Sequence, residues 1–280
     1  MRRLILLAVL TVAAAACASA GPRGPMQRAL DASLERVQRT ETYIQAVSGI
    51  TGDASRLARG DGFVYLADVA PTLRHLGLTG DTASYRKLRQ FVQASMMARD
   101  SAGAQPRRRF RVQAPFEPAS PYAVRRLGDA LALGWQAFGD TASAALAASL
   151  RSGEAPALTG TPSDLLVQQC MAADATVRTD PGVARTLLAS AKGFGSAAPS
   201  AQESQLDLRG IDGELVALAC LTRMGLAVRD PDATVRFLDR LLDRLSPFLR
   251  GSGRPDPGAA AELLLALREV RLAGPHHALP

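Results

Sequence analysis

A recurring junction between amphipathic segments constrains the fold of this 280-residue chain more than any other feature. The run Leu78-Thr79-Gly80-Asp81-Thr82-Ala83-Ser84 is repeated as Ala137-Phe138-Gly139-Asp140-Thr141-Ala142-Ser143, and shorter versions end in Asp180-Pro181 and Asp230-Pro231. Glycine can take the left-handed conformation that ends a helix, and aspartate can accept hydrogen bonds from the free N–H groups that begin the next helix. Proline suits the first helical position. The four junctions therefore predict helix–turn–helix units.

The segments between the junctions have helical periodicity. Residues 235–249 place apolar side chains on one face and Arg and Asp on the other. Residues 123–138, 207–226 and 259–272 are also predicted helices, and about ten are expected from residue 26 onward. Counted from aspartate to aspartate, the junctions lie 59, 40 and 50 residues apart, which is too irregular for a tetratricopeptide array. The sequence predicts an all-α fold of antiparallel helical hairpins, as an incomplete or small α/α toroid or, alternatively, an open α-solenoid.

The first twenty residues have the layout of a bacterial export signal. Met1-Arg2-Arg3 is basic, residues 4–16 are apolar, and Cys17 is followed by three small residues. The apolar run is shorter than the ~20 residues that a membrane-spanning helix needs. We therefore expect residues 1–20 to be a signal peptide and residues 21–280 to be a single helical domain with a flexible tail from about residue 273.

Three processing outcomes remain open for this segment. Ala14-Ala15-Ala16-Cys17 resembles a lipobox, although Ala14 stands where leucine is usual, and cleavage there would leave an acylated Cys17 on a membrane. Ala18-Ser19-Ala20 is an alternative site that would release a secreted protein, and an uncleaved anchor is the third outcome. The expected location is the periplasm or the cell surface, with the membrane-anchored lipoprotein favoured.

The net charge limits the classes of binding partner, and the cysteine content raises the question of a disulfide. The net charge of +7 favours anionic lipid or an acidic glycan weakly, and export argues against nucleic acid as a partner. When Cys17 is acylated or removed, Cys170 and Cys220 are left, and two cysteines in an oxidising compartment can form a disulfide. Both lie in apolar helical segments, so buried free thiols are the alternative.

Residues 60–150 resemble the six-hairpin glycosidase-type α/α toroids. Asp61-Gly62-Phe63-Val64-Tyr65-Leu66 precedes an apolar helix, the Gly80-Asp81 junction and a further helix. The passage from Ser120-Pro121-Tyr122-Ala123 to Gly139-Asp140 has the same arrangement. In glycoside hydrolase family eight the corresponding acid is a glutamate proton donor, whereas this chain has Asp61, one carbon shorter. The chain is also short for a complete ring of twelve helices.

The resemblance implies that carboxyl groups gather at one mouth of the ring. A glycosidase needs two of them, ~6.5–9.5 Å apart in an inverting enzyme. Among the candidates near helix starts and loops, Asp61 is the first choice for catalysis, and its alternative role is to cap a helix. The candidate acids are Asp61, Asp68, Glu117, Glu203, Asp207 and Asp212. Asp207 and Asp212 have the same alternative as Asp61, because they flank a helix start. Glu203, in a Gly-, Ser- and Ala-rich linker, is expected to be solvated.

Aromatic and basic side chains supply the candidate substrate contacts. Tyr65, Tyr122 and Trp135 are candidate sugar-stacking residues, although the neighbours of Trp135 favour a place in the core. The run 107–111 holds four arginines, among them Arg109, and is either a solvated loop or a contact for acidic polysaccharide or lipid headgroups. Arg109-Phe110-Arg111-Val112 is the one segment that favours a short strand.

No cofactor or metal site is predicted. The chain lacks a zinc-type spacing of Cys and His and any Gly-rich phosphate loop, and His75 is expected to be structural. Two functions therefore stand side by side. The first is a toroid that binds or acts on a carbohydrate, as a glycoside hydrolase or polysaccharide lyase, and the second is a non-catalytic helical-repeat lipoprotein that binds a protein partner in the envelope.

Overall fold

The computed structural model describes residues 24–48, 50–100, 103–150, 160–177, 179–197, 211–250 and 255–274. Eleven α-helices form within these residues, which confirms the all-α class. The helices are α2 (Pro25–Asp31), α3 (Leu34–Ser48), α4 (Leu66–Thr79), α5 (Thr82–Phe91), α6 (Pro121–Phe138), α7 (Thr141–Ser149), α8 (Pro162–Thr176), α9 (Pro181–Ser190), α10 (Ile211–Ala227), α11 (Pro231–Leu249) and α12 (Pro257–Ala273). The predicted signal peptide and Cys17 lie outside the described residues. Among the described helices, none combines the length and the apolar character that a bilayer span requires.

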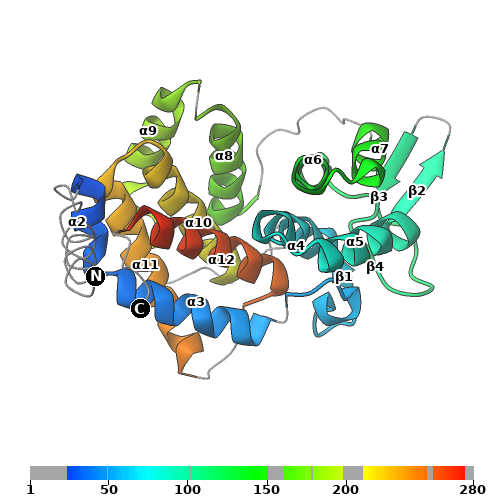
Figure 1. Cartoon of the computed structure of the whole chain (residues 1–280), viewed down its shortest axis with the longest axis horizontal. Coiled ribbons are helices and arrows are strands. Elements are labelled where there is room, and N and C mark those ends of the chain that lie inside the picture. The colour runs from blue at the N-terminus through cyan, green and yellow to red at the C-terminus, as the bar shows by residue number, and fades with distance from the viewer. Residues whose placement is uncertain are drawn as a thin grey trace, which may run out of the picture.

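The helices form hairpins whose first members pack side by side. The first helix of each hairpin lies inside, and these inner helices are α4, α6, α8, α10 and α12 (Figure 1). Each of the first four inner helices is followed in the chain by an outer helix, which is α5, α7, α9 or α11 in turn. Helix α12 has no outer helix after it among the described residues, and α3 from the start of the domain packs against it instead. The first and last long helices therefore complete the fifth hairpin.

The inner helices close into a ring. Helix α4 packs against α6, α8 against α10, α10 against α12, and α12 against α4. The remaining junction, between α6 and α8, is made by Tyr122, whose hydroxyl donates to the Val167 carbonyl 3.3 Å away. In a solenoid each repeat contacts only its neighbours in sequence. The contact of α12 with α4, the last and the first of the inner helices, favours the small α/α toroid over the open α-solenoid.

The predicted junctions form, with one correction. Gly80 (φ 80°) and Gly139 (φ 61°) end their helices in the left-handed conformation. The carboxylates of Asp81, Asp180 and Asp230 accept backbone N–H groups in the first turn of the next helix. Asp140 occupies the same position before α7, but its carboxylate accepts no N–H group from that helix.

Asp140 has a different partner because it is buried against α5. Its Oδ2 lies 3.1 Å from Nε of Arg89 and accepts the Ser143 hydroxyl at 2.8 Å. Only 9% of either charged side chain is exposed. The aspartate of this junction therefore ties α5 to the α6–α7 hairpin instead of capping α7.

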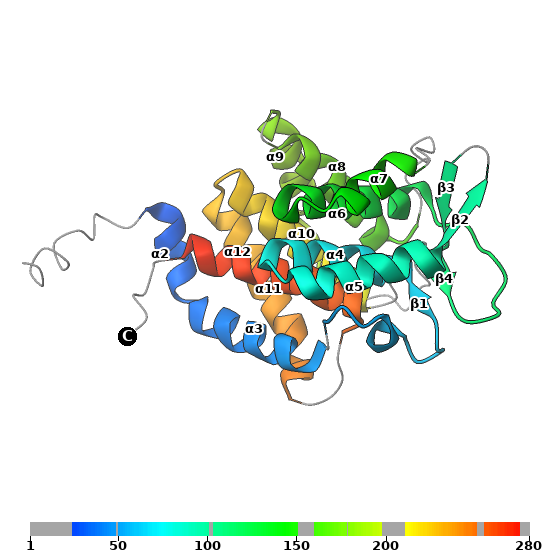
Figure 2. The same cartoon turned by 45° about the vertical axis from the view of Figure 1, so that its right-hand side comes forward.

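Short strands form before α4 and between α5 and α6. Strand β1 (Val64–Tyr65) pairs antiparallel with β4 (Arg109–Phe110), and β2 (Met97–Asp100) pairs antiparallel with β3 (Gly103–Pro106). The strand predicted at Arg109 is confirmed for its first two residues. The β2–β3 hairpin lies at one end of the molecule, beside α5 and α7 (Figure 2).

Side chains fill the centre of the ring. Val167, Val216, Ala217 and Ala259 of α8, α10 and α12 form a small buried cluster there. Beside it, Arg126 of α6 forms a buried ion pair with Glu262 of α12. Burial alone would raise the pKa of Glu262, but Arg126, Arg74 and Arg223 together lower it. The described part of the ring therefore encloses a packed core.

The two roles of the junction aspartates can be separated by mutation. Asp230→Ala removes one helix cap and should lower the free energy of unfolding by about 1 kcal/mol. Asp140→Ala removes no cap but leaves the buried Arg89 without its carboxylate, and should cost about 3–5 kcal/mol. Urea unfolding of both variants measures the difference. Equal losses would contradict the structural role assigned to Asp140.

Candidate functional site

Three inner helices begin at the same mouth of the ring, and each brings an aspartate. Asp68 lies in the first turn of α4, Asp212 in the first turn of α10, and Asp256 at the position that caps α12. The positive ends of three helix dipoles meet there and favour negative charge. These three aspartates and Arg59, here called the acid cluster, form the candidate site.

Arg59 holds the acid cluster together. Its Nε and Nη2 donate to the two carboxylate oxygens of Asp68 at 2.7 and 3.0 Å, and its Nη1 lies 3.0 Å from Oδ2 of Asp256. Asp68 is completely buried, and burial raises its pKa in spite of Arg59. Both oxygens of Asp68 are engaged, so we assign it a structural role in place of the catalytic role that the sequence suggested.

Asp68 also caps a helix other than its own. Its Oδ1 accepts the backbone N–H of Gly258, in the first turn of α12, at 3.0 Å. A Cβ atom at Gly258 would lie 2.6 Å from the Ala67 carbonyl oxygen, so only glycine allows α12 to approach α4 this closely. One buried carboxylate therefore fixes the first turn of α12 against α4.

Within the acid cluster, the Asp212 carboxyl group can still form a further hydrogen bond. Burial raises its pKa to about 7, helped by the charge of Asp256 and a hydrogen bond with its side chain, while Arg59 acts in the opposite direction. Its Oδ1 is buried and has no hydrogen-bond partner among the residues that the structure describes. A carboxyl that is half protonated near neutral pH can donate as well as accept a hydrogen bond, and such groups are frequent in functional sites.

Asp61 lies in the tight turn before β1, next to the cluster. Its Oδ1 accepts the Phe63 N–H at 3.0 Å, and its Oδ2 accepts the Tyr65 hydroxyl at 2.6 Å. The expected alternative, that Asp61 caps a helix, is wrong, because the turn separates it from α4 and Tyr65 occupies the capping position. Asp61 is exposed, and its position orients Tyr65.

Tyr65 connects this turn to Arg59 and Arg109. The Tyr65 ring is 1% exposed and is covered by the Arg59 guanidinium, 4.6 Å from the ring centre. The prediction that Tyr65 is a sugar-stacking surface is therefore wrong, because its face is already occupied. Burial and the hydrogen bond to Asp61 raise the Tyr65 pKa, so the phenol remains protonated at neutral pH.

The arginine run is an ordered structure with internal partners. Arg109 donates from Nε and Nη2 to the two oxygens of Glu117, at 2.9 and 2.6 Å, and these bonds lower the Glu117 pKa. The guanidinium groups of Arg109 and Arg111 lie 4.5 and 4.3 Å from the centre of the Phe63 ring. The description of this run as a plain solvated loop is wrong, because strand pairing places its arginines on Glu117 and Phe63.

The other predicted residues lie elsewhere. Tyr122 is enclosed between α6 and α8, where burial raises its pKa, and its hydroxyl contacts Val167 and Met171. The core position expected for Trp135 is wrong, since 46% of the residue is exposed on α6. Glu203 and Asp207 lie outside the described residues.

Cys170 and Cys220 are buried and form no disulfide with each other, so the alternative of two buried thiols is confirmed. They lie on α8 and α10 within the larger hydrophobic core, which has Leu and Ala as its other main members. A buried thiol packs there as a small apolar group. The pairing of α8 with α10 is held by this packing.

Two residues that sequence reasoning missed bring the site together. Asp256 is followed by Pro257, the same Asp-Pro junction that marks α9 and α11, and this signal could have located it. Arg59 stands in Ala58-Arg59-Gly60, and nothing in the sequence separates it from the other arginines. Its role follows from the turn that brings it over Tyr65 and Asp68.

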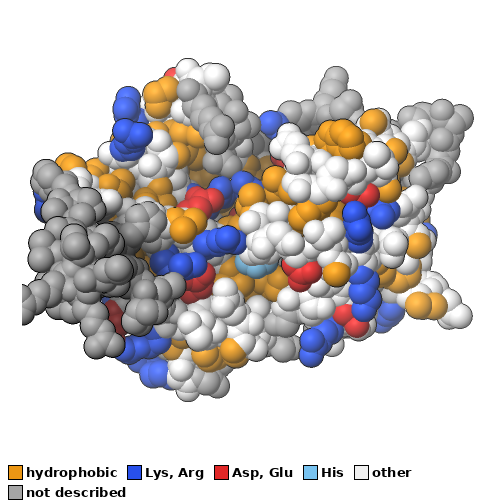
Figure 3. Space-filling view, in the orientation of Figure 1, with side chains coloured by type: hydrophobic (Ala, Val, Ile, Leu, Met, Phe, Trp, Pro, Cys, Tyr) orange, Lys and Arg blue, Asp and Glu red, His pale blue; other side chains and the backbone are white. Residues whose placement is uncertain are grey.

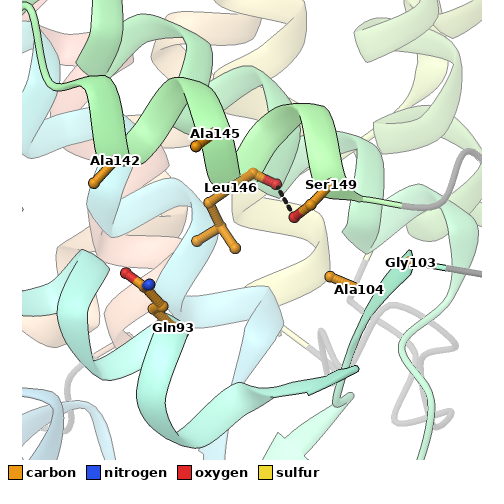
Figure 4. Close-up of a pocket in the computed structure, with 7 residues that line it drawn as sticks. All are labelled: Gln93, Gly103, Ala104, Ala142, Ala145, Leu146 and Ser149. Carbon is orange, nitrogen blue, oxygen red and sulfur yellow. Dashed lines mark hydrogen bonds between the residues drawn. The ribbon is translucent and has the colours of Figure 1, made fainter. Parts of the chain in front are cut away.

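A hollow of about 490 Å³ lies away from the acid cluster. Ala142, Ala145 and Leu146 of α7 form one wall, and Gln93 and Ala104 lie opposite (Figure 4). Ser149, at its rim, donates its hydroxyl to the Leu146 carbonyl at 2.7 Å. Its lining has no carboxyl group, so it lacks the paired acids expected of a glycosidase.

Comparison with known proteins assigns no family. No family model matches the chain, and no curated protein matches it. Among solved structures, the chain is similar to a sugar epimerase from a ruminal bacterium, with a TM-score of 0.38 and 12% identity over 76% of this chain and 70% of that one. A likeness this distant assigns no activity.

The acid cluster should make stability depend on pH in a defined direction. The pKa of Asp212 is higher in the folded chain, at about 7, than its ordinary value of 3.8, so the folded state binds the proton more tightly. The contribution of Asp212 to stability is therefore expected to fall as pH rises from about 4 through 7, by at most about 1.4 kcal/mol per pH unit, whereas His75, whose pKa is lowered to about 4, acts in the opposite direction up to its ordinary value of 6.5.

Urea unfolding from pH 5 to pH 8 measures this dependence. Asp212→Asn should remove this contribution, so its stability relative to the wild type should rise from pH 5 to pH 8. Asp239→Asn, at an exposed ion pair on α11, serves as the control and should keep the wild-type slope. An unchanged slope in Asp212→Asn would show that Asp212 titrates near its ordinary pKa.

Proposed function

We propose that this chain is an exported envelope lipoprotein, anchored through acylated Cys17, whose helical ring binds a carbohydrate at the mouth formed by α4, α10 and α12. One observation carries the proposal: within the described part of the chain, Asp212 has a buried oxygen without a hydrogen-bond partner, beside Asp256, while both oxygens of Asp68 are bound. Sugar hydroxyl groups both donate and accept hydrogen bonds. A carboxyl pair that shares a proton can donate a hydrogen bond to a sugar hydroxyl group and can also accept one from it.

The same geometry favours binding over hydrolysis. Retaining glycosidases keep their two carboxyl groups about 5–5.5 Å apart, and inverting enzymes keep them ~6.5–9.5 Å apart. Asp212 and Asp256 are hydrogen-bonded to each other, which is closer than either arrangement. The packed ring centre, with Arg126 and Glu262, also supports a surface site at the mouth over a deep catalytic cleft.

Binding of a protein partner is the second candidate function. The observation that favours it is the exposure of Trp135 on α6 and of Leu78 at the end of α4, at 46% and 42%. Exposed tryptophan is enriched among residues that dominate protein interfaces. This function uses a different surface from the acid cluster, so mutations can separate the two.

Carbohydrate binding can be tested with an array of envelope oligosaccharides. We expect wild-type protein to bind at least one glycan, and Asp212→Asn and Asp256→Asn to weaken binding about tenfold or more, as for the loss of a hydrogen bond to a charged group. Asp239→Asn should bind normally. Release of reducing ends by the wild type would show catalysis and overturn the binding assignment.

Two outcomes would contradict the proposed carbohydrate site. Glycan binding that is unchanged in both cluster variants would exclude the acid cluster as the site. Capture of an envelope protein that is lost in Trp135→Ala, but retained in Asp212→Asn, would support the second function instead.

Anchoring can be tested independently of ligand binding. Wild-type protein should fractionate with membranes and carry acyl groups on Cys17, whereas Cys17→Ser should lose the lipid, because the acyl chains supply the membrane affinity. Mass spectrometry of the mature N-terminus measures both. A mature N-terminus at Gly21 would show cleavage at the alternative site and a secreted protein.

A further inference from the structure

A second polar hollow lies on the outer side of the ring, between α3, α4 and α12. Its volume is about 420 Å³, within the range of small-ligand pockets. Gln45 and Ser48 of α3, His75 of α4 and Asp81 line it, together with apolar side chains that include Ile50 and Leu264. His75 lies seven residues beyond Asp68, about 10 Å along α4. The hollow is therefore separate from the acid cluster.

Two residues that line this hollow each have a buried side-chain atom with no hydrogen-bond partner in the described part of the chain. The atoms are the hydroxyl oxygen of Ser48, a residue only 6% exposed, and Nδ1 of His75, which is 9% exposed. Buried polar atoms in native proteins are nearly always paired, because an unpaired one destabilises the fold. Two such atoms on residues that line one hollow mark a place where a bound molecule could complete their hydrogen bonds.

The charges around the hollow define the class of that molecule. Burial, with Arg268 contributing, lowers the pKa of His75 to about 4, so its imidazole is neutral at pH 7. Among the described residues that line the hollow, Asp81 carries the only formal charge, and none is Lys or Arg. Asp81 is a like charge for a phosphate or carboxylate group, and Arg268 is not among these lining residues. Histidine is visible from outside on this face, among side chains of both charges (Figure 3).

We propose that this hollow binds a small neutral molecule with several hydroxyl groups, a monosaccharide or a polyol. Hydroxyl groups satisfy the unpaired Ser48 oxygen and His75 nitrogen, and the Gln45 amide and Asp81 carboxylate offer further partners. The C–H face of the molecule packs against Ile50 and Leu264. This site does not depend on the function proposed for the ring mouth.

The experiment titrates the full chain with D-glucose, D-galactose, myo-inositol and glycerol, and with inorganic phosphate as the charged comparison. Thermal shift and calorimetry should detect binding of at least one neutral probe and none of phosphate. Which neutral probe binds distinguishes a sugar from a polyol. Ser48→Ala and His75→Asn should weaken that binding at least tenfold, whereas Thr42→Ala, on the exposed face of the same helix, should bind normally.

Stability without ligand provides the folding control. Ser48→Ala removes an unpaired buried hydroxyl, so its melting temperature should equal or exceed that of the wild type, while the shift caused by the probe disappears. The imidazole ¹⁵N resonances of His75 should move when the probe binds. Asp212→Asn should leave this binding unchanged, and its loss in that variant would place the ligand at the ring mouth instead.

Three results would overturn the proposal. They are the absence of a shift with every neutral probe at millimolar concentration, equal shifts in the wild type and Ser48→Ala, and tighter binding of phosphate than of any neutral probe.

Discussion

The buried contact between Asp68, Arg59 and Gly258 is the interaction on which the ring depends. Asp68 is completely buried, and its two carboxylate oxygens are bound by Arg59 and by an N–H group in the first turn of α12, which offset the cost of burying this polar group. The same carboxylate therefore ties the first long inner helix to the last one. Without Gly258 the two backbones could not approach, and the chain of hairpins would lose the contact that turns a linear array into a ring.

Ring closure also determines where chemistry can occur. Because the inner helices α4, α10 and α12 begin at one mouth, their first-turn aspartates meet there, although 144 residues separate Asp68 from Asp212 in the sequence. The centre of the ring is occupied by Arg126, Glu262 and small apolar side chains. Ligands are therefore expected at the mouth and on the outer side, where buried polar atoms remain unpaired.

Sequence reasoning located a large part of the candidate site but mistook the roles of several residues. Asp61, Tyr65 and Arg109 do lie together, because β1 pairs with β4, yet Tyr65 is covered by Arg59 and Arg109 is bound to Glu117. Periodicity and residue type show which side chains are able to bind a substrate. They do not show which of them already have an internal partner, since that depends on segments distant in the sequence.

The sequence by itself determined the helices and the places where they end, because left-handed glycines, capping aspartates and first-turn prolines act within a few residues. Gly80, Gly139, Asp81, Asp180 and Asp230 all act as their local sequence predicts. Only the tertiary structure decided that the hairpins close, that Asp140 binds Arg89, and that Arg59 gathers three aspartates. These contacts join helices from different hairpins, and their strength comes from burial, which no local pattern in the chain specifies.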